Sequence, residues 1–239
     1  MVLSGLRKKA ETIYIRYFKE GRYIKRRVKC PFQWFGNDYG GFYVCPDFLD
    51  HNSVVYSFGI GEDLSFSLGL IDAFQCSVYG FDPTPRSIEW VYQQSLPETF
   101  HFSGVGIDKE SGRVRFFLPR NAQYVSGSRV EQINVSVHHS IEVQMKRFID
   151  IASELGHRKI DVLKLDIEGS EHDVIPDVLQ SGVDISQILI EFHDRFMPNG
   201  RQQTNKTVNE LRKYGYEIFA VSDTCQEVSF IKTALIQSK

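Results

Sequence analysis

The fold is decided by one stretch, Val162-Leu163-Lys164-Leu165-Asp166-Ile167-Glu168-Gly169-Ser170-Glu171. Its first half is an apolar run of the kind found in interior strands of parallel sheets. Its second half carries two carboxylates and a glycine, and it then opens a helical sequence. A strand that passes into a helix in this way is the repeating unit of α/β folds. The acidic turn is therefore expected at the carboxyl end of a central strand, where open sheets bind their ligands.

The same alternation of strands and helices extends to both sides of this stretch. We expect strands at 54–58, 76–81, 99–105, 160–165, 187–192, 216–221 and 227–235, and helices at 64–74, 85–95, 143–155, 171–180 and 207–214. An aromatic and glycine-bearing segment at 31–44 reads as a strand and turn pair that leads into the core. The pattern predicts an α/β fold with a mostly parallel sheet and helices on both faces. We expect one domain over residues 31–239.

Composition and charge describe an ordinary globular protein. The 239 residues are 42% hydrophobic and 24% charged with a net charge of −2, which excludes disordered, collagenous and small disulfide-rich classes. The four cysteines form no C-x-x-C pair, so neither a zinc site nor a redox dithiol is indicated. No apolar run approaches the roughly 20 residues of a membrane span, and no secretory signal is legible. We therefore expect a cytoplasmic location.

Basic charge is concentrated in residues 1–30. This segment has ten basic residues against Glu11 and Glu20, a net charge of +8, whereas the rest of the chain carries −10. Its apolar residues recur at helical spacing, which predicts a basic amphipathic N-terminal helix over 1–30. Two interpretations remain open: the helix packs on the domain with a solvated basic face, or it contacts an anionic partner or a membrane surface. No nucleic-acid module accompanies it, so no nucleic-acid partner is expected, and no oligomeric state is assigned.

A glycine turn and an acidic residue follow the first two strands. Gly59 and Gly61 allow close approach of the backbone to an anion or a polar tail, although such glycines also serve simple strand-to-helix turns. Asp82 lies 23 residues after Gly59, where it can accept hydrogen bonds from two ribose hydroxyls or cap the next helix. Leu64 stands in place of the third glycine of a dinucleotide fingerprint, which disfavours NAD.

Two acidic strand ends and a histidine are expected at the same edge. Asp166 and Glu168 follow one strand, and Glu191, His193 and Asp194 end or follow the next. We assign no metal ligand, although Asp166, Glu191, His193 and Asp194 form an oxygen-rich set that would alternatively suit Mg²⁺. Glu171 is interpreted as a first-turn acid that stabilises the helix dipole.

Three of these segments together resemble a known family. The stretches Phe58-Gly59-Ile60-Gly61-Glu62-Asp63, Phe81-Asp82-Pro83 and Leu163 to Glu171, with Tyr39-Gly40-Gly41, resemble the FkbM-type S-adenosylmethionine-dependent methyltransferases. The likeness is closest to the methyltransferase-like 24 group and covers roughly residues 30–235. It implies a Rossmann-like class I methyltransferase fold with a mostly parallel seven-stranded sheet, an N-terminal helical extension, and S-adenosylmethionine as cofactor.

The resemblance also implies roles for individual positions. The methionine portion of the cofactor would lie on Phe58, Gly59, Gly61 and Glu62, the ribose on Asp82 beside Pro83, and the adenine beside Gly106 and Ile107. Asp166 and Glu168 would lie near the sulfonium and the acceptor. The reaction implied is O-methylation of a sugar or another polyhydroxylated small molecule or glycan.

Transfer to a hydroxyl requires that its proton leave, so a base within hydrogen-bond reach is useful. The candidate catalytic residues are Asp166, Glu168 and His193. Acceptor contacts are expected in the segments 108–112 and 119–132, from Arg120, Asn121 and Tyr124, although these are equally interpreted as ordinary loop residues. An NAD-linked oxidoreductase and a non-catalytic interaction module on the same fold remain as alternatives.

Overall fold

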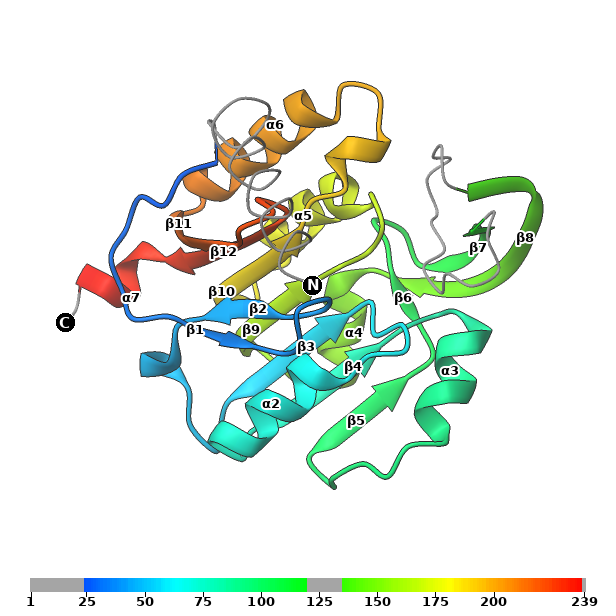
Figure 1. Cartoon of the computed structure of the whole chain (residues 1–239), viewed down its shortest axis with the longest axis horizontal. Coiled ribbons are helices and arrows are strands. Elements are labelled where there is room, and N and C mark those ends of the chain that lie inside the picture. Colours follow the sequence, from blue (N-terminus) through cyan, green and yellow to red (C-terminus); the bar gives the residue numbers. More distant parts are fainter. Residues whose placement is uncertain (1–23, 120–134, 238–239) are drawn as a thin grey trace, which may run out of the picture.

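A seven-stranded sheet forms the centre of the computed structural model, which describes residues 24–119 and 135–237 (Figure 1). The strand order is β11-β12-β10-β9-β3-β4-β5. The strands are β3 (Val54–Phe58), β4 (Ser77–Phe81), β5 (Phe100–Ser103), β9 (Lys159–Leu165), β10 (Asp184–Glu191), β11 (Tyr216–Val221) and β12 (Glu227–Lys232). The predicted seven-stranded sheet is therefore confirmed.

The sheet is parallel except at one strand. Neighbouring strands from β10 through β5 pair in parallel, whereas β12 is antiparallel to both β10 and β11. The chain winds outward from β3 toward β5 and then returns to β9 on the other side of β3. The direction of winding thus reverses between β3 and β9, and a ligand crevice is expected outside the carboxyl ends of these two strands.

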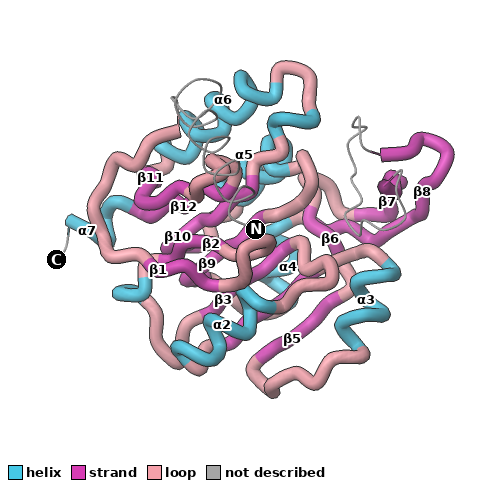
Figure 2. The backbone as a smooth tube through the Cα atoms, viewed as in Figure 1, coloured by secondary structure: helices cyan, strands magenta, loops and turns pink. Residues whose placement is uncertain are grey.

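Each face of the sheet has its own hydrophobic core, because side chains of a strand alternate between the faces. Leu163 and Leu165 belong to one core and Val162 to the other. The first core is covered by α4 (Phe148–Glu154), α5 (Glu171–Gln180) and α6 (Gly200–Lys213). The second is covered by α2 (Ser65–Phe74), α3 (Pro85–Tyr92) and the hairpin of β1 (Gln33–Phe35) and β2 (Phe42–Val44). Figure 2 shows α2 in front of the sheet and α4 behind it.

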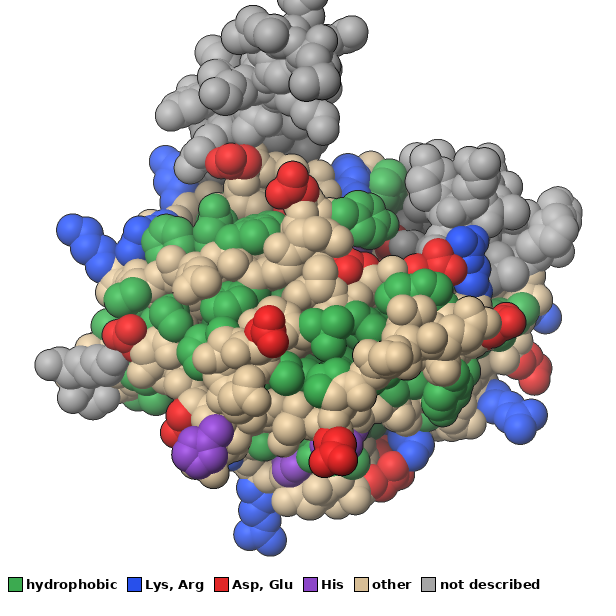
Figure 3. Space-filling view, turned by 60° about the horizontal axis from the view of Figure 1, so that its bottom comes forward, with side chains coloured by type: hydrophobic (Ala, Val, Ile, Leu, Met, Phe, Trp, Pro, Cys, Tyr) green, Lys and Arg blue, Asp and Glu red, His purple; other side chains and the backbone are tan. Residues whose placement is uncertain are grey.

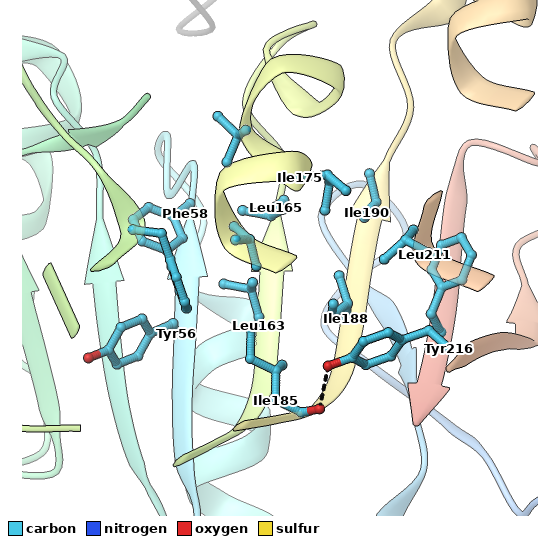
Figure 4. Close-up of a cluster of buried hydrophobic side chains, with 14 of the residues drawn as sticks. Tyr56, Phe58, Leu163, Leu165, Ile175, Ile185, Ile188, Ile190, Leu211 and Tyr216 are labelled. Atoms are coloured by element: carbon cyan, nitrogen blue, oxygen red, sulfur yellow. Dashed lines mark hydrogen bonds between the residues drawn. The ribbon is translucent and has the colours of Figure 1, made fainter. Parts of the chain in front are cut away.

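Figure 4 shows the first core where β3, β9 and β10 lie side by side. Leu163 and Ile188 meet the side chains of α5 and α6, including Ile175 and Leu211. At the lower end of the cluster the buried hydroxyl of Tyr216 donates a hydrogen bond of 2.7 Å to the carbonyl of Ile185. The core therefore fixes the strands up to the edge at which β3 and β9 end.

A second, three-stranded sheet follows β5. It has the order β6-β8-β7, from β6 (Gly106–Ile107), β7 (Gly112–Pro119) and β8 (Val135–Lys146). The prediction of a helix from residue 143 was wrong, because α4 begins only at Phe148. Val143 and Met145 are buried while Glu142 and Gln144 are exposed, which is the alternation of a strand paired antiparallel with β7.

The N-terminal prediction is corrected for its last residues. Residues 24–30 form no helix: the amides of Arg27 and Val28 both donate to the carbonyl of Ile218 on β11, and Ile24 is buried in the first core. These contacts hold the segment against the edge of the sheet in an irregular conformation. Residues 1–23 lie outside the described residues, so for them the basic helix stays a prediction.

The surface mixes side chains of every kind on the face shown in Figure 3, with Lys and Arg side chains mostly near its margin.

The remaining short helices are η2 (Pro46–Phe48), η3 (Asp194–Phe196) and α7 (Thr233–Gln237). In the part of the chain that the structure describes, no helix has the length and apolar character required to cross a bilayer.

The hairpin is attached to the sheet by a buried amide. Gln187 on β10 accepts from the backbone N–H of Cys45 at 2.8 Å and donates to the carbonyl of Cys45 at 3.0 Å. Both residues are fully buried. The side chain of Gln187 thus makes the two backbone hydrogen bonds that a neighbouring strand would otherwise make with Cys45, the residue that follows β2.

We expect Gln187→Leu to lower the free energy of unfolding by about 2–4 kcal/mol, because two buried backbone groups lose their partner. Urea unfolding measures this change. The matched control is Gln180→Leu on the exposed end of α5, for which a change within about 0.5 kcal/mol is expected. Equal effects of the two substitutions would show that the amide of Gln187 does not anchor the hairpin.

Candidate functional site

A cavity of about 850 Å³ opens where β3, β4, β9 and β10 end. Its walls come from the segments that follow these four strands, from β6, and from the turn of the β1–β2 hairpin. All of the predicted site residues line it: Phe58, Gly59, Gly61, Glu62, Asp82, Pro83, Gly106, Ile107, Asp166, Glu168 and His193. The structure thus brings positions more than 130 residues apart to one cavity, while their individual roles stay predictions.

The glycine turn after β3 approaches two neighbouring strands closely. Gly59 and Gly61 have φ values of +81° and +57°, in the left-handed region that favours glycine. The N–H of Gly59 donates to the carbonyl of Phe81 at 3.0 Å. A Cβ on Gly59 would lie 1.8 Å from the carbonyl oxygen of Asp166, whereas a Cβ on Gly61 would meet no atom of the described residues within 4 Å.

The two glycines therefore provide a matched test of this close approach. Gly61→Ala is expected to cost about 1–2 kcal/mol of stability from the left-handed backbone alone. Gly59→Ala adds a clash that forces β3 and β9 apart, so we expect a total loss of about 3 kcal/mol or more. Thermal or urea unfolding of both variants measures the difference. Equal losses would contradict the tight contact between Gly59 and Asp166.

Asp82 fixes the glycine turn to the start of α3. One carboxylate oxygen accepts from the N–H of Gly61 at 2.8 Å, and the other accepts from the N–H and hydroxyl of Thr84 at 2.9 and 2.6 Å. A carboxylate offers about four acceptor positions, so about one remains for a ligand. Asp82 is not the N-cap of α3, as its second interpretation expected, because Thr84 holds that position and Asp82 only accepts from it. The remaining acceptor position leaves room for one ribose hydroxyl rather than two.

The wall between the turn and β6 is apolar. The rings of Phe58 and Phe81 stack with centroids 4.4 Å apart, and Pro83, Ile107 and Met145 also line the cavity. A flat ring system fits against such a wall. Glu62, at the outer margin, forms an ion pair with Arg86 of α3 through contacts of 2.7 and 2.9 Å.

The hairpin turn is a cavity wall that the sequence analysis did not assign to the site. Asn37 donates to the carboxylate of Asp63 at 2.9 Å, and its own amide oxygen accepts from the N–H groups of Tyr39 and Gly40. Asp63 also accepts from Ser65 at the start of α2. The turn is thereby tied to the loop that follows β3. The glycines at 40 and 41 were part of the family resemblance, which is the signal that pointed to this wall.

Lys164 is a second feature that the sequence analysis missed. Its side chain is buried on β9, and its ammonium group donates to the carbonyl of Gly59 at 3.1 Å. It also lies 3.4 Å from Asp166 Oδ2 and 5.4 Å from the ring centroid of Phe42. A lysine inside a buried strand is unusual, and only its charge distinguished it from its apolar neighbours.

The acidic end of the cavity is organised around His193. Its Nδ1 lies 2.9 Å from Glu171 Oε1, and both side chains are buried. The same oxygen of Glu171 accepts from the N–H of Gly169 at 3.1 Å. Glu171 is therefore the partner of His193, and its interpretation as only a helix-dipole acid was incomplete. Nε2 of His193 lies 3.4 Å from Glu168, 3.5 Å from Glu191 and 3.8 Å from Asp166.

These charges shift the pKa values strongly. Burial alone lowers the pKa of His193, but the charge and hydrogen bond of Glu171, with Glu168 and Glu191, outweigh it and raise the pKa to about 10. Burial, then the charge of Asp166, raises the pKa of Glu191 to about 8. Burial opposes ionisation of Glu171, but His193 holds the pKa of Glu171 below its usual value. The neighbouring carboxylates therefore favour the protonated form of His193, and its role as a base stays a prediction.

Glu168 has a strained backbone conformation, with φ of +52°, and Gly169 follows with φ of +97°. A left-handed glutamate is uncommon, and such conformations gather at functional sites. Arg195 and Phe196 form the outer margin beside it, with the guanidinium 4.4 Å from the ring centroid. The carboxylates of Asp166, Glu168 and Glu191 line the same cavity as the cations Lys164 and Arg195 and the ring of Phe196.

Three of the four possible metal ligands come together. One ligand atom each from Asp166, Glu191 and His193 lies within 4.8 Å of the others. Asp194 is not part of this group, and its Oδ2 lies 3.5 Å from the hydroxyl of Thr204. Arg120, Asn121 and Tyr124, the predicted acceptor contacts, lie outside the described residues.

Comparison with known proteins gives one family and several distant folds. The family described as the methyltransferase FkbM domain matches residues 53–218. No curated protein sequence matches the chain.

Among solved structures, similar folds include two archaeal proteins and one human protein. A Methanococcus jannaschii fibrillarin, a pre-rRNA processing protein, has 12% identity and a TM-score of 0.45, over 77% of this chain and 67% of that one. Aeropyrum pernix fibrillarin with bound S-adenosyl-L-methionine has 11% identity and a TM-score of 0.42, over 87% and 85%. Human N-acetylserotonin methyltransferase in complex with SAM has 9% identity and a TM-score of 0.37, over 75% and 47%. Likenesses this distant assign neither a substrate nor a residue role.

Proposed function

Since this chain belongs to the FkbM family of S-adenosylmethionine-dependent methyltransferases, we propose that it methylates a hydroxyl of a sugar or another polyhydroxylated small molecule. The observation that carries the proposal is a single cavity with a glycine turn and an apolar wall at one end and three carboxylates at the other. Small polyols suit a site lined by several hydrogen-bond acceptors, because hydroxyls donate to carboxylates.

The residues at the inner end fit the cofactor. The glycine turn and the open space beside Gly61 can receive the methionine portion, and Asp82 can accept a hydrogen bond from one ribose hydroxyl. The part of the apolar wall at Gly106 and Ile107 can receive the adenine. When bound there, S-adenosylmethionine supplies a methyl group on a positively charged sulfur. Negative charge from Asp166 and Glu168 stabilises a cation in a partly water-excluded site.

At the outer end, the carboxylates orient the acceptor and remove its proton. Glu168 is placed to accept the proton of the acceptor hydroxyl. The hydroxyl oxygen would bond to the methyl carbon as the bond between that carbon and sulfur breaks, and the electron pair of the broken bond would remain on the now neutral sulfur. Asp166 is held in place by Lys164, and His193 is held by Glu171, so both are positioned before the acceptor enters. Much of the rate acceleration then comes from alignment of the reacting groups rather than from further chemistry by the protein.

The charge of the cavity lining also bears on the class of acceptor. The groups that line the cavity carry more acidic than basic side chains, which disfavours a polyanionic nucleic acid at the reacting end. An anionic partner or a membrane surface would instead be contacted by the basic segment 1–23. A cytoplasmic location remains part of the proposal.

A methyl-transfer assay tests the proposal. The full chain is incubated with S-adenosylmethionine and a panel of glycans, small polyols, proteins and RNA, and products are identified by mass spectrometry. We expect a single methyl ether on a glycan or polyol. Transfer only to protein nitrogen or to RNA would overturn the proposed acceptor class.

A further inference from the structure

We propose that the acidic end of the cavity is a binding site for one divalent cation of the Mn²⁺ or Mg²⁺ type, held by Asp166, Glu191 and His193. One ligand atom from each lies within 4.8 Å of the other two. The proposal follows the alternative that the sequence left open, without Asp194. It concerns the protein alone and does not depend on the identity of the methyl acceptor.

The backbone places the two carboxylates side by side. Asp166 directly follows β9 and Glu191 ends β10, and these strands pair in parallel with Ile190 opposite Leu165. The next position along this ladder brings residues 166 and 191 next to each other. A site built on strand ends is held more firmly than one built on flexible loops.

His193 is oriented as a metal ligand. Its Nδ1 faces Glu171 at 2.9 Å, so Nε2 is directed at the carboxylates. Metal-bound histidines commonly donate their second ring N–H to a carboxylate in this way, which fixes the ring and increases its basicity as a ligand. The side chain of His193 is 2% exposed and that of Glu171 is 0% exposed, so this pair is sheltered from water.

The distances around Nε2 are those of ligands that share an ion. Nε2 lies 3.4 to 3.8 Å from its three carboxylate neighbours, beyond the usual hydrogen-bond range of about 2.7–3.2 Å. Among the described residues, Nε2 thus has ion-pair neighbours but none at hydrogen-bond distance. Two ligands about 2.1 Å from one ion lie about 3.0–3.6 Å apart at angles between 90° and 120°, and about 3.8 Å apart at an angle of about 130°. The 3.5 Å between Nε2 and Glu191 lies in the first range, and the 3.8 Å between Nε2 and Asp166 corresponds to the wider angle. The buried ring nitrogen is therefore aimed into a gap of the size that a small cation requires.

The charges and donor types indicate the class of cation. Lys164 is nearest to Oδ2 of Asp166, while the other oxygen, Oδ1, faces Nε2. Once the ion has displaced the Nε2 proton of His193, the carboxylates of Asp166, Glu168, Glu191 and Glu171 outnumber the nearby cations Lys164 and Arg195, and a divalent ion would balance this excess. In the described part of the chain, no cysteine lines the cavity. Carboxylates with one imidazole suit Mn²⁺ or Mg²⁺ better than ions that prefer sulfur.

The cation would leave coordination positions open toward the cavity. Neighbouring hydroxyls of a polyhydroxylated acceptor are suitable ligands for them, an extension that rests on the proposed function. Coordination lowers the pKa of a bound hydroxyl and so assists transfer of its proton to Glu168.

Direct titration with Mn²⁺, followed by electron paramagnetic resonance and calorimetry, tests the site in the full chain without acceptor. The titration is made at pH 8, because a metal ion binds Nε2 of His193 only when that nitrogen has lost its proton, and a higher pH favours this loss. We expect one saturable site from which Mg²⁺ displaces Mn²⁺. Asp166→Asn and Glu191→Gln are expected to weaken Mn²⁺ binding by about 100-fold or more, and Glu171→Gln by about 10- to 100-fold. Glu89→Gln, at an exposed carboxylate of α3, is the control and is expected to bind as the unsubstituted protein does.

The outcomes separate the two proposals. Each variant is first shown to be folded by a cooperative urea unfolding transition. Should both ligand variants fail to fold, Mn²⁺ must raise the Tm of the unsubstituted chain saturably. No saturable Mn²⁺ binding, binding that Asp166→Asn and Glu191→Gln both leave intact, or binding of Zn²⁺ with exclusion of Mn²⁺ overturns the cation site. Saturable Mn²⁺ binding without methylation of any glycan or polyol overturns only the proposed acceptor.

Discussion

Glu168→Gln is expected to lower kcat by about 10²- to 10⁴-fold, the usual contribution of a general base. The substitution keeps the size of the side chain and removes its ability to accept the hydroxyl proton. Binding of S-adenosylhomocysteine, which lacks the sulfonium charge, is expected to change by less than about threefold. A single-turnover assay with the acceptor found in the panel measures the rate, and calorimetry measures the binding.

The structural basis is the position of Glu168 on a strained turn. Its φ of +52° directs the carboxylate to within 3.4 Å of Nε2 of His193, at the margin of the cavity. The matched control is Glu89→Gln, whose exposed carboxylate lies on α3 and for which unchanged kcat is expected. An undiminished rate in Glu168→Gln would remove Glu168 as the base, and an absence of methyl transfer in the unsubstituted chain would favour the non-catalytic alternative.

Glu171→Gln is expected to lower the free energy of unfolding by about 3–5 kcal/mol, since it leaves the buried charge of His193 without its closest counter-charge. The amide oxygen can still accept from the N–H of Gly169, so the change isolates the loss of charge. Urea unfolding measures the effect, with Glu89→Gln expected to stay within about 0.5 kcal/mol.

A double-mutant cycle with His193→Gln shows whether this loss comes from the pair. If Glu171 acts through His193, the double variant is expected to be less destabilised than the sum of the two single variants, by about 1–3 kcal/mol. Strict additivity would indicate that Glu171 stabilises the fold through other contacts. The same cycle distinguishes stabilisation by the Glu171–His193 pair from stabilisation by Glu171 as an acid near the positive end of the helix dipole.

Much of the site could be predicted because parallel strands end at a common edge. Gly59, Asp82 and Asp166 each follow a strand whose apolar pattern is readable in the sequence, so their meeting follows from the topology alone. The strand 54–58 and the helix 171–180 were predicted with the bounds that the structure has. These elements depend on local patterns, which sequence reasoning reads directly.

Features that depend on distant partners could not be predicted. Lys164 reads as part of a buried strand, and its acceptor, the carbonyl of Gly59, lies 105 residues away. Gln187 bonds a residue 142 positions distant, and nothing local marks its amide as an anchor. Residues 143–146 were predicted as helix because the helical pattern of 148–155 extends backward, whereas residues 143–145 pair with β7 and residues 145–146 pair with β6.

Calorimetric titration of the full chain with S-adenosylhomocysteine tests the central claim most directly. The account predicts one saturable site, and about 10- to 100-fold weaker binding in Asp82→Ala, which loses both the ribose contact and the carboxylate that holds the turn at Gly61. Failure to bind S-adenosylhomocysteine, or saturable binding of NAD in its place, would contradict it.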